Sequence, residues 1–136
     1  PVASGSLTFV NVSDTNSGSN CESLSFWVTN TGGASATITS ITVSWTGTTA
    51  YYKTIIWGST TVFELGGSPR GVSGTTYNLS TSQTLSAGAS VKISVNDFRQ
   101  NNTTGGGSKR DMQVVPFTIT FSNGSILTFE TRGLCN

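Results

Sequence analysis

Residues 113–135, QVVPFTITFSNGSILTFETRGLC, decide the fold class of this chain. In their first half apolar and polar residues alternate, so that Phe117 and Phe121 fall on one face. A period of two is typical of a half-buried β-strand. Asn123 and Gly124 follow, and an Asn-Gly pair favours the tight type I′ turn of a β-hairpin. We therefore predict two antiparallel strands joined at this pair.

The same alternation recurs through the chain, in CESLSFWVT (21–29), TITSITVSW (37–45) and VKISVNDF (91–98). Turn-forming residues separate the alternating stretches about every 8–12 residues. No segment has apolar residues at the i, i+3, i+4, i+7 spacing of a helix. We predict an all-β protein with seven to nine short strands in a two-sheet sandwich, immunoglobulin-like or jelly-roll.

The first twenty residues differ from the rest. Residues 7–13 read as a strand, and SDTNSGSN (13–20) follows as a tether with nothing apolar to bury. We predict an N-terminal extension over residues 1–20 and a single sandwich domain over residues 21–136. The strand in the extension pairs either with its own domain or with another molecule.

Charge is scarce in this sequence. Asp, Glu, Lys and Arg make up 10% of its 136 residues, against about a quarter in a typical domain. The few cations are scattered, which excludes the basic stripe of a nucleic-acid or anionic-membrane binder. Neutral hydroxyls tolerate acid and salt, and the chain starts at Pro1 without a leader, so we expect a processed protein at the extracellular surface. No apolar run has the 18 or so residues of a membrane span.

Two cysteines lie near the two ends of the predicted domain, at Cys21 and Cys135. An even number of cysteines in a secreted chain predicts a disulfide. Closing so long a loop stabilises the fold by about 4–5 kcal/mol in the chain-entropy model. Two free thiols in a cytosolic protein are the alternative.

Catalytic residues are few. The chain has no histidine, which removes the usual general base and the usual zinc ligand. Asp97 and Asp111 flank the long loop at 99–111, but a glycosidase needs two carboxylates facing each other across a cleft. We interpret both as solvated residues at the ends of the loop. The prediction is a protein that is not an enzyme and that binds no cofactor or metal.

Aromatic residues offer a second kind of site, because sugar rings stack on flat aromatic surfaces of β-sandwich binding modules. Trp45 and Trp57 are in phase with aliphatic neighbours, which favours the core. Trp27 is out of phase with Phe26 and Val28, so it faces the other side of its strand. A carbohydrate-binding or adhesive module is therefore an alternative function.

Five Asn-x-Ser/Thr sequons mark candidate sites for N-linked glycans. Several of them fall in expected loops or turns, where a glycan has room, although asparagine is also a common turn residue without modification. The five are Asn11, Asn78, Asn101, Asn102 and Asn123.

Three stretches, VTNTGGASATITSITVSW (28–45), TLSAGASVKISV (84–95) and FTITFSNGSILTF (117–129), resemble the β-rich domains of archaeal and bacterial pilin-type surface filament subunits. The shared features are a strand ending in Asn-x-Gly, a glycine turn before a strand, and a hairpin on Asn-Gly. The resemblance runs over about residues 21–131. It implies a structural subunit of an extracellular filament or surface layer.

The sequence departs from type IV pilins, because it shows no long apolar N-terminal helix. The resemblance then implies donor-strand complementation, in which the N-terminal strand of one subunit completes a sheet of the next. Copies of the same chain are the expected partners, with covalent N-glycans in addition. An ordinary first strand that pairs with its own sheet is the alternative. The candidate interface residues are Leu7, Phe9, Val10 and Val12.

Overall fold

The computed structural model describes residues 6–10, 16–17, 20–64, 70–103 and 106–132. These residues form ten strands and no helix, so the prediction of an all-β chain is confirmed. One strand more than the predicted range is found, and β2 has only two residues. The strands are β1 (Leu7–Val10), β2 (Asn16–Ser17), β3 (Ser23–Asn30), β4 (Ala36–Trp45), β5 (Thr54–Trp57), β6 (Thr60–Glu64), β7 (Thr76–Leu85), β8 (Ser90–Asn96), β9 (Pro116–Phe121) and β10 (Ile126–Glu130).

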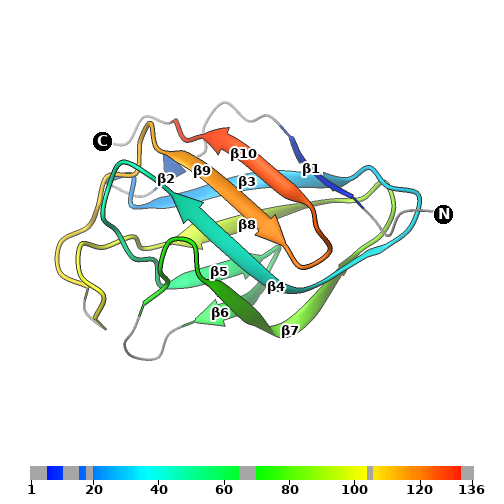
Figure 1. Ribbon diagram of the computed structural model, residues 1–136, viewed down its shortest axis with the longest axis horizontal. Coiled ribbons are helices and arrows are strands. Elements are labelled where there is room, and N and C mark those ends of the chain that lie inside the picture. The colour runs from blue at the N-terminus through cyan, green and yellow to red at the C-terminus, as the bar shows by residue number, and fades with distance from the viewer. Residues whose placement is uncertain (1–5, 11–15, 18–19, 65–69, 104–105, 133–136) are drawn as a thin grey trace.

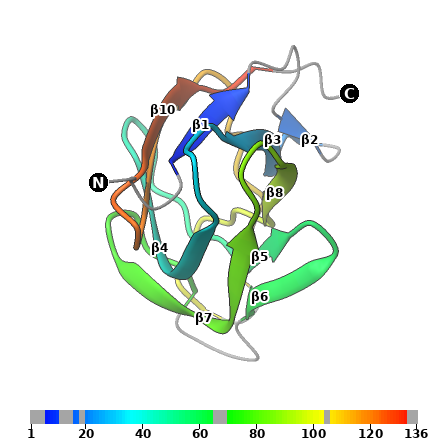
Figure 2. The same ribbon diagram turned by 90° about the vertical axis from the view of Figure 1, so that its right-hand side faces the viewer.

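The strands build two antiparallel sheets that pack face to face as a sandwich (Figure 1). The larger sheet has the order β1-β3-β8-β5-β6, and β2 also pairs with β3. The smaller sheet has the order β10-β9-β4-β7 and lies in front of the larger one in Figure 1. At one side of the sandwich β1 lies beside β10, and at the other β6 lies beside β7 (Figure 2).

Alternation along each strand decides which side chains enter the core. In β3 the side chains of Leu24, Phe26 and Val28 are fully buried, whereas Trp27 between them is 43% exposed. This confirms that Trp27 faces away from the core. Trp45 and Trp57 are buried between the sheets, also as predicted.

Tyr52 sits at the centre of an aromatic cluster near one end of the core. Its buried ring packs against the rings of Trp45, Phe63, Tyr77 and Phe98 at centroid distances of 5.6–6.2 Å. The backbone of Gly71 packs against the Tyr52 ring. The two residues exchange two main-chain hydrogen bonds, of 2.8 and 3.2 Å. A methyl group on Gly71 would lie 2.2 Å from Cζ of Tyr52.

We expect Gly71→Ala to destabilise the fold by about 2–3 kcal/mol, because the Tyr52 ring has no room to move aside. Urea unfolding measures the change. In a Tyr52→Leu background the same substitution should cost less than about 1 kcal/mol, since the obstructing ring is gone. Equal costs in the two backgrounds would show that the contact with the ring is not the cause.

The hairpin predicted from residues 113–135 is present, with β9 and β10 paired from Ile126 opposite Thr120. Its turn differs from the prediction. Among the turn residues only Gly124 has a positive φ, of 93°, whereas a type I′ turn needs two such residues. The N–H of Gly124 donates to the carbonyl of Phe121, and the N–H of Phe121 donates to the carbonyl of Ser125. The loop therefore has three residues, with Gly124 in the left-handed position that closes it.

The N-terminal segment lies along the edge of the larger sheet. β1 pairs with β3 from Leu7 opposite Asn30 to Val10 opposite Trp27, and β2 pairs farther along the same strand, from Asn16 opposite Leu24. The tether prediction is wrong at Asn16, whose side chain is buried and donates a 3.0 Å hydrogen bond to the carbonyl of Met112. Asn11, Val12 and the residues up to 15 lie outside the described residues.

Candidate functional site

Strand β1 and the edge of the sheet on which it lies form the first candidate site, a candidate subunit interface, because this strand covers one side of the core. Leu7 is 3% exposed and belongs to the core cluster, whereas Thr8 points outward. The N–H of Leu7 donates to Oγ of Ser125 at 2.9 Å, which ties the strand to the β9–β10 turn. Of the four predicted interface residues, Phe9 and Val10 are placed only by their backbone register on β3, opposite Val28 and Trp27.

Asn30 fixes the start of β1. Its side chain is completely buried, and its Oδ1 accepts hydrogen bonds of 3.0 Å from the N–H groups of Ser6 and Gly32. Its Nδ2 donates to the carbonyls of Ala34 and Leu85 at 2.9 and 2.8 Å. One amide thus joins the N-terminal strand, the β3–β4 loop and the end of β7. This role could not be predicted from the sequence, since Asn30 in NTGG is typical of a turn residue.

Charge is segregated between the two ends of the sandwich. We call the turns at 31–35, 86–89 and 122–125 the neutral end, since these turns contain no charged residue. The opposite end, which we call the charged end, consists of loops 46–53 and 97–115 and the segment around Arg70. It carries four further cations, Lys53, Arg99, Lys109 and Arg110, and two acids, Asp97 and Asp111.

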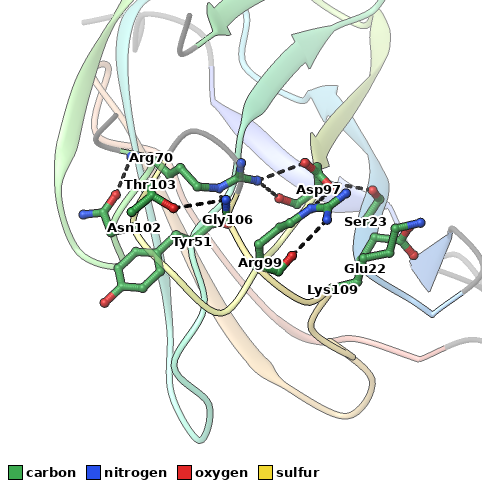
Figure 3. A network of polar contacts seen from close by, with 11 residues as sticks. Glu22, Ser23, Tyr51, Arg70, Asp97, Arg99, Asn102, Thr103, Gly106 and Lys109 are labelled. Carbon is green, nitrogen blue, oxygen red and sulfur yellow. Dashed lines mark hydrogen bonds and ion pairs between the residues drawn. The ribbon is translucent and has the colours of Figure 1, made fainter. Parts of the chain in front are cut away.

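An ion network organises the charged end (Figure 3). Arg70 is the largest fully buried side chain, and its Nη2 lies 3.1 Å from Oδ2 of Asp97. Arg70 also donates to the carbonyls of Tyr51 and Asp97. The second oxygen of Asp97 accepts from Nε of Arg99 at 2.8 Å. Asp97 itself has a positive φ of 62°, a conformation that aspartate tolerates better than most residues.

The interpretation of Asp97 as a solvated residue is therefore wrong, because it holds two arginines. Partial burial alone would raise the pKa of Asp97, but the hydrogen bonds from Arg99 and Arg70 outweigh it and hold that pKa below its ordinary value. Asp111, by contrast, is exposed, as predicted.

The long loop at 99–111 is folded back on itself. The N–H of Gln100 donates to the carbonyl of Ser108, and the N–H of Asn101 donates to the carbonyl of Gly106. At its base, Nζ of Lys109 lies 3.1 Å from Oε2 of Glu22, which is mostly buried. Polar contacts therefore anchor a loop in which the sequence shows no apolar residue.

The sequons differ in how their asparagines are placed. Asn78 is exposed on the edge strand β7, and Asn101 is exposed in the long loop. Asn102 is half-buried and accepts a hydrogen bond from the N–H of Arg70. Asn123 accepts one from the N–H of Ser125 at 3.1 Å. Glycan occupancy at these positions and at Asn11 remains a prediction.

Cys21 is buried, at the start of the turn into β3, and has a positive φ of 54°. Its predicted partner, Cys135, lies outside the described residues. The Cys21–Cys135 bridge remains a prediction, and non-reducing mass spectrometry would decide it.

A pocket of about 200 Å³ opens at the charged end, between loop 46–53 and the strand entry at 72–73. Aromatic and aliphatic groups form part of its wall, and hydroxyl-bearing residues form the rest. Its lining residues are Trp45, Thr48, Thr49, Ala50, Tyr51, Val72 and Ser73. The sequence predicted Trp45 as a core residue, and nothing in it placed Val72 and Ser73 beside it.

Neither the protein-family models nor the curated proteins compared with this sequence match it. In the described part of the chain, no three His, Cys, Asp or Glu side chains group to hold a metal ion. The described residues also include no helix long and apolar enough to cross a membrane.

Proposed function

We propose that this protein is a structural subunit of an extracellular filament or surface layer, in which copies of the chain are joined through strand β1. The observation that carries the proposal is the place of β1 at the edge of its sheet, with Leu7 inserted into the core. An edge strand can leave its sheet without breaking any other strand pair. Its slot then accepts the same strand from a second copy.

Every contact that β1 makes within its own chain has an equivalent between two copies. The β3 ladder, the Ser125 hydroxyl and the Asn30 amide would each receive the same partner atoms from a neighbouring subunit. Exchange therefore costs little beyond the loss of freedom on association. The unpaired edge that would otherwise promote aggregation becomes the joint.

The surroundings of β1 also favour such a joint. The strand begins at the neutral end, and the groups that hold it there are hydroxyls, amides and main chain from Asn30, Thr31 and Ser125. None of these described groups is charged, so none of them loses the hydration of a charge when the strand is inserted. We accordingly expect the joint to persist in acid and in high salt, as an extracellular filament requires.

Leu7→Asp tests the proposal, because it places an unpaired charge in the apolar slot. We expect the full-length protein to form polymers that sediment and that negative-stain microscopy resolves as filaments. The Leu7→Asp variant should stay monomeric. Thr8→Asp is the matched control, since Thr8 points outward on the same strand, and it should still assemble.

A truncated chain separates exchange between copies from ordinary pairing. A variant lacking residues 1–13 keeps β2 but has an empty slot, and it should bind a synthetic LTFVNV peptide (residues 7–12). If the full-length protein is a stable monomer while the truncated chain unfolds and ignores the peptide, β1 serves only its own domain. That result would rule out the filament function in this form.

A carbohydrate-binding or adhesive module is the second candidate function. It is favoured by the exposed Trp27 on the outer face of the larger sheet, where its neighbours include the hydroxyl pairs Ser25–Ser94 and Thr29–Ser90. A module of this kind would be monomeric and retained on an immobilised polysaccharide.

A further inference from the structure

Hydrogen bonds to main-chain groups hold the walls of the pocket at the charged end in place. Tyr51 exchanges two backbone hydrogen bonds of 2.9 Å with Arg99, and Nε of Arg110 donates to the carbonyl of Thr49 at 2.9 Å. Ser73 accepts from the N–H of Trp45 and donates to its carbonyl, at 2.8 and 3.0 Å. The backbone at Tyr51 and Thr49 and the side chain of Ser73 are therefore held in place before any ligand binds, which lowers the entropic cost of binding.

Several polar groups of the lining are left for a ligand. Within the described part of the chain, the hydroxyls of Thr48, Thr49 and Tyr51 take part in no hydrogen bond. Thr49 is exposed, and Thr48 and Tyr51 are half-exposed. In Figure 3 the ring of Tyr51 points away from the ion network. Each hydroxyl can both donate and accept, so the site suits a ligand that does the same.

The chemistry of the lining narrows the class of ligand. No Asp, Glu, Lys or Arg lines the pocket, although the end as a whole is charged, so the lining residues offer an ion no countercharge. A purely apolar ligand would cover three hydroxyls and leave them without partners, which is costly. A neutral sugar ring has hydroxyls around its edge and an apolar face of C–H groups that packs on an aromatic ring. It matches both parts of the wall.

We propose that this pocket binds a single neutral pyranose residue, with the ring of Tyr51 and the edge of Trp45 as the apolar wall and Thr48 and Thr49 as the polar wall. The volume of about 200 Å³ is below the roughly 300–1,000 Å³ of sites for drug-sized molecules, so it limits the ligand to one ring. This activity does not depend on polymerisation through β1. A filament built from such subunits would present one weak sugar site per subunit, and repetition would provide avidity.

Titration of the full chain with glucose, galactose, mannose and N-acetylglucosamine tests the proposal, and two-dimensional NMR spectra recorded at each sugar concentration measure the binding. For one small ring we expect a Kd on the order of 1–10 mM for at least one of these sugars. The three tryptophan indole N–H signals separate the candidate surfaces. The signal of Trp45 should move with the sugar, whereas those of the exposed Trp27 and the buried Trp57 should stay.

Two variants check the assignment. Tyr51→Ala should weaken binding at least tenfold and leave the fold intact, because the substituted ring is half-exposed and the hydrogen bonds of residue 51 are main-chain. Trp27→Ala, which removes the aromatic group of the sheet face, should leave the affinity unchanged. Glucuronate, the charged counterpart of glucose, should bind more weakly than the best neutral sugar.

Three results would overturn the proposal. One is the absence of any shift of the Trp45 signal with all four neutral sugars at tens of millimolar. Another is a shift confined to Trp27, which would place binding on the sheet face. The third is tighter binding of glucuronate than of any neutral sugar, which would assign the pocket to an anion.

Discussion

Asp97→Asn is expected to lower the free energy of unfolding by about 3 kcal/mol at pH 7. Asparagine has nearly the same shape as aspartate and also tolerates the positive φ of this position, but it removes the negative charge that faces Arg70. Arg70 is 1% exposed, so its guanidinium would remain buried without the negative charge of Asp97. Breaking a buried ion pair by removing one partner typically costs about 3–5 kcal/mol. Urea unfolding of the two proteins gives the difference.

Asp111→Asn is the matched control, because Asp111 is exposed and forms no ion pair within the described residues. It should change stability by less than about 0.5 kcal/mol. Arg99→Ala removes the partly exposed partner of Asp97 and should cost about 1 kcal/mol or less. A cost for Asp97→Asn no larger than that of Arg99→Ala would show that burial of Arg70 does not depend on this carboxylate.

The same pair of proteins gives a pH dependence of known sign. The pKa of Asp97 is lower in the folded state than in the unfolded state, so its contribution is fully present above the unfolded pKa of about 4. It is lost as the pH falls through the lower folded pKa. The stability gap between the wild-type protein and Asp97→Asn should therefore narrow below about pH 4. A gap that stays constant in acid would contradict the assignment.

Asn30→Ala is expected to cost about 3 kcal/mol as well, through lost hydrogen bonds rather than charge. Two N–H donors and two carbonyl acceptors lose their hydrogen-bond partner. The amide is completely buried, and the methyl group of alanine can form none of these four hydrogen bonds. The release of Ser6 should also loosen the start of β1. Urea unfolding measures the global effect, and hydrogen exchange of the Ser6 and Thr31 amides measures the local one.

Asn123→Ala serves as the control for Asn30→Ala. Asn123 is half-buried and its Oδ1 accepts from the N–H of Ser125 in the hairpin turn. Its loss should cost about 1 kcal/mol or less and leave exchange at Ser6 unchanged. Similar losses at the two positions would mean that Asn30 acts as a turn residue and does not join β1 to the rest of the sandwich.

Much of the fold could be predicted because alternation is a local property. The two-residue period of a strand is enough to assign Trp27, which is out of phase with its apolar neighbours, to the solvent side and Trp45, which is in phase, to the core side. The position of the β9–β10 hairpin could likewise be predicted from residues that are neighbours in the sequence. The predicted type I′ turn was wrong, because three residues rather than two form the loop. The hydrogen bond from the N–H of Ser125 to the side chain of Asn123 supports that longer form.

The candidate sites could be predicted only in part, because their members are distant in sequence. Arg70 and Asp97 lie 27 positions apart, and Asn16 meets Met112 across 96 positions. Polar residues such as Asn16 and Asn30 are ordinarily assigned to the surface, and only a partner from another segment makes their burial favourable. The pocket combines two loops in the same way.

The sequence by itself determined that this chain forms β-strands, which faces of them are apolar, and that few charges are available. Those properties follow from side-chain size, branching and polarity within a few residues. Tertiary structure alone decided that β1 lies on β3, that Asp97 pairs with a buried arginine and that three uncharged turns lie together at one end. The free energy of a strand pair or a buried ion depends on what covers it, and the covering groups come from distant parts of the chain.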